Sequence, residues 1–102
     1  MFLIEIYLPA ATPPSAENPK EAFRAVRLEL TEKFGGVTAF LRAPAAGLWQ
    51  DPQGNVQRDE IVIFEVMAKR LDRKWWAEYR KTLEKRFQQE SILVHASLIE
   101  TL

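Results

Sequence analysis

The feature that most constrains the fold of this chain is a helical spacing that occurs twice. Large apolar residues recur at intervals of three, four and four positions, which places them on one face of a helix. The first set is Phe23, Val26, Leu30 and Phe34, and the second, 53 residues later, is Trp76, Tyr79, Leu83 and Phe87. A β-rich segment precedes and follows each set, so the chain consists of two β-α-β halves.

In the first half, strict alternation over residues 2–8 predicts a strand with one strongly apolar face. Two adjacent prolines predict a loop before the first helix. Asn18 is a suitable N-cap, Pro19 fits the first helical position, and Gly35 can close the helix in a left-handed conformation. We therefore expect a helix over residues 19–34, and a strand over 37–42 after it.

The second half begins with a predicted long hairpin. Residues 48–50 resume the strand after a bend near Pro44 and Gly47, residues 51–55 have turn chemistry, and residues 58–68 form the returning strand. Asp72 then caps a second helix that extends to about Gln89, and residues 92–99 form the last strand.

This element order, β-α-β-β-α-β, predicts an α+β chain of the ferredoxin-like class, as one domain over residues 1–102. Two right-handed crossovers place both helices on one face of a four-stranded antiparallel sheet. The expected spatial order of the strands is 4-1-3-2, so that the first strand lies between the fourth and the third.

Charge and composition exclude several function classes. The 14 basic residues balance 14 acidic ones, which argues against a dedicated nucleic-acid or membrane-surface protein. There is no cysteine and only one histidine, so the usual cysteine and multi-histidine metal sites are absent and no metal or cofactor is expected. No apolar run approaches the roughly 20 residues that cross a bilayer, and a cytoplasmic location is the default expectation.

Alternation also predicts which side chains lie on the sheet face without helices. They include Leu3, Glu5 and Tyr7 from the first strand, Ile61, Ile63, Glu65 and Met67 from the third, and Leu93, His95, Ser97 and Ile99 from the fourth. The opposite positions of the last strand, Ile92, Val94, Ala96 and Leu98, are expected to be buried. An uncovered face this apolar usually marks an interface or a ligand site.

Glu5, Glu65 and His95 are the candidate catalytic residues. Neighbouring strands bring them together, and two carboxylates with a histidine in an apolar setting can have displaced pKa values and perform acid-base chemistry. The structural alternative is that they pair with each other, with Tyr7 or with Arg42 across a dimer interface. The sequence leaves open whether the protein is an enzyme.

Tyr7, Arg42 and Trp49 are the candidate ligand-binding residues. Tyr7 and Arg42 can position a small molecule, and Trp49 can cover a pocket or simply pack on its own sheet. An RNA-binding alternative rests on the basic second helix, but Asp59 and Glu60 occupy the start of the third strand, where the RNA-binding class of this scaffold has a basic residue and glycine. A solvated helix face is the better interpretation.

Three segments resemble a bacterial family of small uncharacterised proteins: Phe34-Gly35-Gly36-Val37-Thr38, the stretch from Gly47 through Trp49 to Val56, and Arg58-Asp59-Glu60. The likeness covers about the middle third of the chain; it implies a ferredoxin-like fold and no assigned activity. More loosely, the layout resembles the dimeric α+β barrel proteins, which include small monooxygenases and isomerases. Two functions therefore stay open: a homodimeric binding or interaction module, and a cofactor-independent enzyme acting on a small metabolite.

Overall fold

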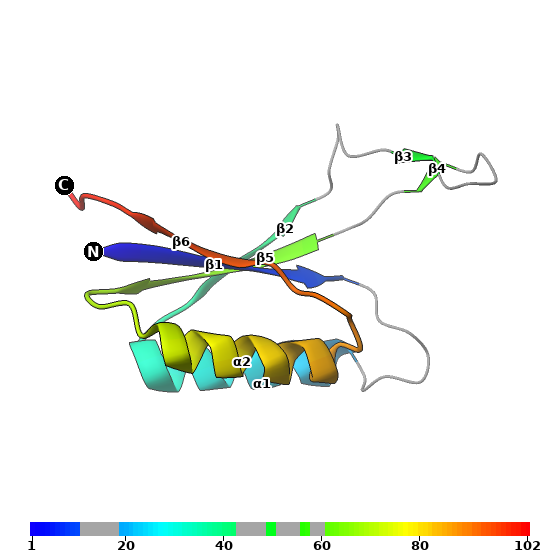
Figure 1. The fold of residues 1–102 in the computed structure, drawn as a ribbon, viewed down its shortest axis with the longest axis horizontal. Helices are drawn as coiled ribbons and strands as arrows, with labels where there is room; N and C mark the ends of the chain where they lie inside the picture. Colours follow the sequence, from blue (N-terminus) through cyan, green and yellow to red (C-terminus); the bar gives the residue numbers. More distant parts are fainter. Residues whose placement is uncertain (11–18, 43–48, 51–55, 58–60) are drawn as a thin grey trace.

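A computed structural model describes residues 1–10, 19–42, 49–50, 56–57 and 61–102. A four-stranded antiparallel sheet is formed, in spatial order, by β2 (Thr38–Arg42), β5 (Ile61–Ala68), β1 (Phe2–Pro9) and β6 (Val94–Leu98). The helices α1 (Pro19–Phe34) and α2 (Arg73–Arg86) both lie on one side of it (Figure 1). In chain order, β1, β2, β5 and β6 are the first, second, third and fourth strands of this sheet. Their spatial order, read from β6, is therefore 4-1-3-2, so the predicted ferredoxin-like fold and strand order are confirmed.

The predicted long hairpin is divided into two parts. β2 pairs with β5 in the main sheet, whereas β3 (Trp49–Gln50) pairs with β4 (Val56–Gln57) in a separate two-stranded ribbon. The bend expected near Pro44 and Gly47, the turn at 51–55 and the start of the returning strand at 58–60 lie outside the described residues.

The helix ends follow from local chemistry. Gly35 has φ of 83° and its N–H donates to the Thr31 carbonyl at 2.8 Å, which closes α1 at the predicted residue. The Asp72 carboxylate caps α2 by accepting the Trp75 N–H at 3.1 Å. The end predicted at about Gln89 is wrong: α2 stops at Arg86, and Gln88 takes a left-handed backbone conformation with φ of 51°.

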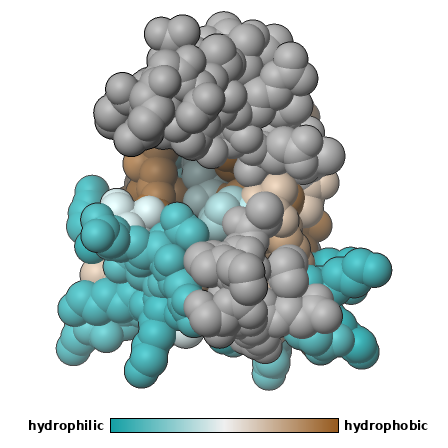
Figure 2. All heavy atoms as spheres, turned by 90° about the vertical axis from the view of Figure 1, so that its right-hand side faces the viewer, coloured by the Kyte–Doolittle hydropathy of each residue, from teal (hydrophilic) through white to brown (hydrophobic). Residues whose placement is uncertain are grey.

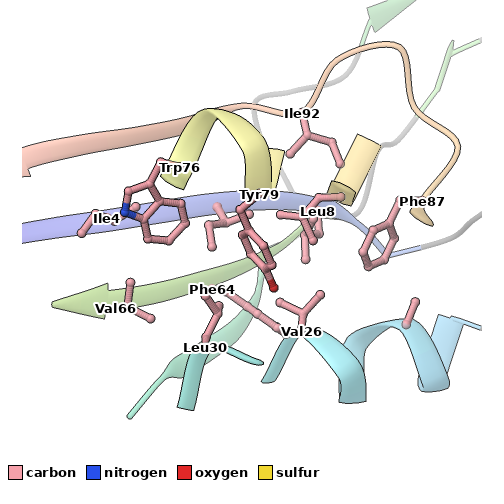
Figure 3. Packing of buried hydrophobic residues seen from close by; sticks show 13 residues of the cluster. Ile4, Leu8, Val26, Leu30, Phe64, Val66, Trp76, Tyr79, Phe87 and Ile92 are labelled. Carbon is pink, nitrogen blue, oxygen red and sulfur yellow. The ribbon is translucent and has the colours of Figure 1, made fainter. Parts of the chain in front are cut away.

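The core lies between the helices and the sheet (Figure 3). Both repeats of the helical spacing contribute to it: the buried members are Val26, Leu30, Trp76, Tyr79, Leu83 and Phe87, and Phe23 and Phe34 are half-buried against them. The sheet contributes Ile4, Ile6, Leu8, Phe64 and Val66. The predicted helix-facing stripes are therefore confirmed.

The last strand differs from expectation in two ways. β6 spans Val94–Leu98 rather than 92–99, because the Ile92 N–H donates to the Glu84 side chain at 3.1 Å instead of joining the ladder. The expectation that Ala96 and Leu98 are buried is wrong, since Ala96 is exposed and Leu98 is 74% exposed. β6 is an edge strand, and within it only Val94 is partly buried against the core.

Candidate functional site

The sheet face opposite the helices carries the predicted site residues Glu5, Glu65 and His95. Alternation from the core positions assigns to it Leu3, Glu5, Tyr7, Ile61, Ile63, Glu65, Met67, Leu93, His95 and Ser97, together with Thr38. We call this set the open face. Met67 and Leu93 are 54% and 57% exposed, whereas Ile63 is 2% exposed although it does not belong to the core between sheet and helices. The open face is thus apolar and only partly covered.

Hydrophilic side chains gather on the outer surface of the helix layer. Figure 2 shows hydrophilic residues over the lower part of the molecule, where the helices lie, and apolar residues in the band above them. No helix among the described residues is long and apolar enough to cross a membrane.

The three candidate catalytic residues lie in one row across the open face. Strand register pairs Glu65 with Glu5, and Glu5 with His95. The His95 Nε2 and Glu5 Oε1 atoms are 3.7 Å apart, and the Tyr7 and His95 rings lie 5.3 Å apart between centroids with a tilt of 41°. We call Glu5, Glu65 and His95 the polar row. Its members come together as expected from the sequence.

The two carboxylates of the polar row influence each other. Burial raises the pKa of Glu65, and a hydrogen bond with Glu5 and the negative charge of Glu5 raise it further. The pair therefore holds a proton to higher pH than an isolated glutamate would. Chemically, such a pair can donate a hydrogen bond from its protonated carboxyl while its other carboxylate accepts a proton.

A concavity of about 470 Å³ adjoins Glu65. The open-face residues Leu3, Thr38 and Met67 line one part of it, and the segment that links α1 to β2 lines the rest through Phe34, Gly35, Gly36 and Val37. Thr38 stands opposite Glu65 in the β2–β5 register, so the concavity offers a hydroxyl and a carboxyl beside apolar walls. Its volume suits a small metabolite.

The predicted ligand-binding residues are only partly brought to this row. Tyr7 contacts His95, as described above. Arg42 pairs with Ile61 in the backbone register, four residues along β5 from Glu65, or about 13 Å. Trp49 pairs with Gln57 in the separate ribbon. The side chains of Arg42 and Trp49 lie outside what the structure describes.

A second concavity was missed by sequence reasoning, which treated the basic residues of α2 as a solvated face. It has a volume of about 240 Å³ and lies between α2 and the edge strand β6, with Arg73 and Arg80 on one wall and Val94 and Ala96 on the other. The only sequence signal for it is the seven-residue spacing of the two arginines, which places them on the same side of the helix.

Metal ligation is not supported by the described residues, in which no three histidine, aspartate or glutamate side chains are arranged to hold an ion.

No protein-family model matches the chain, and no curated protein matches it either. Among solved structures, it is similar to a mutant of CutA1 from Pyrococcus horikoshii OT3, with a TM-score of 0.59 and 10% sequence identity. The match covers 100% of this chain and 86% of that chain. At this identity the likeness shows a small ferredoxin-like fold alone.

Proposed function

We propose that this chain is a homodimeric binding or interaction module that associates through its open face. The observation that carries the proposal is the exposure of Met67 and Leu93 on a sheet face that neither helix covers. Burying such side chains against a second copy removes apolar area from water, and each fully buried large side chain is worth about 1.5–3 kcal/mol.

The polar row fits the centre of such an interface. Glu5, Glu65 and His95 are already partly satisfied within one chain, through the His95–Glu5 contact and the carboxyl pair. His95 and Glu5 can therefore enter an interface as a contacting pair. The proposal also includes three properties predicted from the sequence. These are membership of the bacterial family named above, a single domain over residues 1–102, and a cytoplasmic location.

The test is the oligomeric state at micromolar concentration, measured by size-exclusion chromatography with light scattering. We expect a dimer for the wild type, and for Leu93→Glu a dimer dissociation constant raised at least about tenfold, because a charge is desolvated in the interface. Leu28→Glu is the matched control, since Leu28 is also 57% exposed but lies on α1. A wild type that is wholly monomeric would refute the proposal.

A second candidate function is a cofactor-independent enzyme on a small metabolite, of the dimeric α+β barrel kind. It is favoured by the polar row beside the 470 Å³ concavity. In this alternative His95 or a carboxylate acts as general base, and Tyr7 or Arg42 stabilises a developing oxyanion.

A metabolite screen by thermal melting tests the second candidate. A ligand that binds only the folded state, at about 100 times its Kd, adds about 2.7 kcal/mol of stability. We expect one compound class to raise the Tm of the wild type and of Ser97→Ala but not of His95→Ala, because Ser97 is exposed on the same strand and lies outside the polar row. A shift that persists in His95→Ala would remove His95 from the site.

A further inference from the structure

The free edge of the sheet at β6 has backbone groups available for pairing. β6 lies at one end of the order β2-β5-β1-β6, and no described strand pairs with its outer side. All of its residues after Val94 are exposed, and Leu98 is 74% exposed. Edge strands are commonly protected from pairing by a proline, a lysine or an inward-pointing charged residue. β6, with the sequence VHASL, contains no proline, lysine or acidic residue.

The register identifies which groups point outward. The Tyr7 N–H donates to the Leu93 carbonyl at 3.0 Å, and the Ile99 N–H donates to the Met1 carbonyl at 2.9 Å. In an antiparallel pair, hydrogen-bonded and non-hydrogen-bonded positions alternate. Counting every second residue from Leu93, the backbone N–H and C=O groups of Leu93, His95, Ser97 and Ile99 turn toward β1. The N–H and C=O groups of Val94, Ala96 and Leu98 therefore turn away from β1.

The second concavity continues this edge toward α2. Val94 and Ala96 place their side chains on the helix side, where Ile4 and Trp76 form an apolar floor. The opposite wall is one flank of α2, on which Arg73, Ala77 and Arg80 follow one another at helical spacing. A strand added to β6 would lay every second side chain along this flank.

The charge of α2 indicates which kind of strand would pair with the outer edge of β6. The helix carries six basic and two acidic residues, and its first turn contains Arg73 and Lys74 without an acid, which opposes the helix dipole. The only acid on this flank, Glu84, already lies 3.8 Å from Arg80. A second copy paired edge to edge would bring two basic helices together, whereas an acidic segment would be attracted.

We infer that the outer edge of β6 binds an extended, acidic segment of another protein as an additional strand. Backbone groups of Val94, Ala96 and Leu98 form the ladder, and side chains in the second concavity select the sequence. Arg73 and Arg80 are about 10.5 Å apart along the helix. In a strand, residues two positions apart are separated by about 7 Å and residues four positions apart by about 13 Å, so the arginine spacing falls between these two values. The preferred pattern is acid, small apolar, acid at alternate positions, with the apolar side chain over Ala77.

The probe is a fluorescein-labelled, end-blocked heptapeptide of sequence Thr-Glu-Thr-Val-Thr-Glu-Thr, titrated with the full chain by fluorescence anisotropy. We expect saturable binding, and amide shift changes in the nuclear magnetic resonance spectrum that centre on Val94, Ala96 and Leu98. The same peptide with lysine in place of both glutamates is expected to bind at least about tenfold more weakly.

Two sets of variants separate the ladder from the charges. Ala96→Pro removes an outward N–H without removing a bond to β1, so it should fold, as a melting curve will verify, and lose peptide binding. Arg73→Glu with Arg80→Glu should weaken binding at least about tenfold. The matched control is Lys74→Glu with Lys81→Glu, which makes the same charge change one position round the helix and should have a much smaller effect.

The inference is overturned by several results. These are absence of saturable binding at millimolar peptide, unchanged binding in a folded Ala96→Pro variant, or equal losses in the two charge-reversal pairs. Tighter binding of a single-stranded oligoribonucleotide that displaces the peptide would assign the basic flank to nucleic acid instead. Because β6 pairs through its outer edge, the result is independent of whether the open face dimerises.

Discussion

At the scale of the residue, Glu65 is an ionisable group of the open face whose pKa is shifted by its surroundings. Its carboxyl lies beside Glu5, and burial, the hydrogen bond with Glu5 and the charge of Glu5 all raise its pKa. A raised pKa in the folded state means that the folded protein binds the proton more tightly than the unfolded chain does. The stability contributed by this proton is present below pH 4.5, the ordinary value, and is lost as pH rises through the folded-state pKa.

We therefore expect Glu65→Gln to raise the Tm at pH 7 by about 2–4 °C, since the neutral amide removes the repulsion. The difference should shrink as pH falls below 4.5, where Glu65 becomes increasingly protonated in both states. Melting curves from pH 4 to pH 8, at one fixed protein concentration, measure it. Glu32→Gln, at an exposed position of α1, is the control and should show no such pH dependence. A lower Tm for Glu65→Gln at pH 7 would contradict the prediction.

At the scale of the element, the two glycines after α1 have different tasks. Gly35 adopts φ of 83°, a conformation that side chains with a Cβ adopt at a cost, whereas Gly36 does not lie in that region. At neither position would an added Cβ meet another atom within 4 Å. Backbone conformation alone distinguishes the two sites.

We expect Gly35→Ala to lower the unfolding free energy by about 1–2 kcal/mol, because alanine in the left-handed conformation is strained. Gly36→Ala should be neutral or stabilise by up to about 1 kcal/mol, through a less flexible unfolded chain. Urea denaturation of the two variants measures both effects. Equal effects would show that the αL closure of α1 is not what the glycine provides.

At the scale of the whole molecule, the ion pair of Glu29 with Arg86 joins the helices of the two β-α-β halves. The Glu29 carboxylate on α1 accepts from Arg86 Nη1 at 2.6 Å and Nη2 at 2.9 Å, and from the Tyr79 hydroxyl at 3.0 Å. The hydrogen bond from Arg86 is the main cause that lowers the pKa of Glu29, against the effect of burial. Stability from this pair is therefore present above pH 4.5 and is lost as pH falls through the lowered pKa.

We expect Arg86→Met to lower the unfolding free energy by about 1 kcal/mol at pH 7, discounted for the partial exposure of Glu29. The loss should be smaller at pH 2 than at pH 7, because protonation of Glu29 progressively removes the pair from the wild type as pH falls below 4.5. Urea denaturation at both pH values measures it. Arg80→Met, which breaks an exposed pair with Glu84 at 3.8 Å, should cost less than about 0.5 kcal/mol. A loss that is equal at both pH values would argue for packing of the arginine stem instead.

Periodicity and capping determined most of the fold from the sequence alone. The twofold helical spacing, Pro19 and Gly35 placed α1, Asp72 placed the start of α2, and the element order predicted the sheet order. The helix faces and caps are local features, because each depends on residues within a few positions of each other. The same alternation also brought Glu5, Glu65 and His95 into one row.

Only the tertiary structure decided how well each face is covered. Ala96 and Leu98 have the pattern of buried positions, yet they are exposed, because an edge strand has one neighbour instead of two. Arg73 and Arg80 resemble a solvated face, yet α2 sets them beside β6 and creates a concavity. Coverage depends on contacts between elements far apart in the chain, and short-range periodicity carries no information about those contacts.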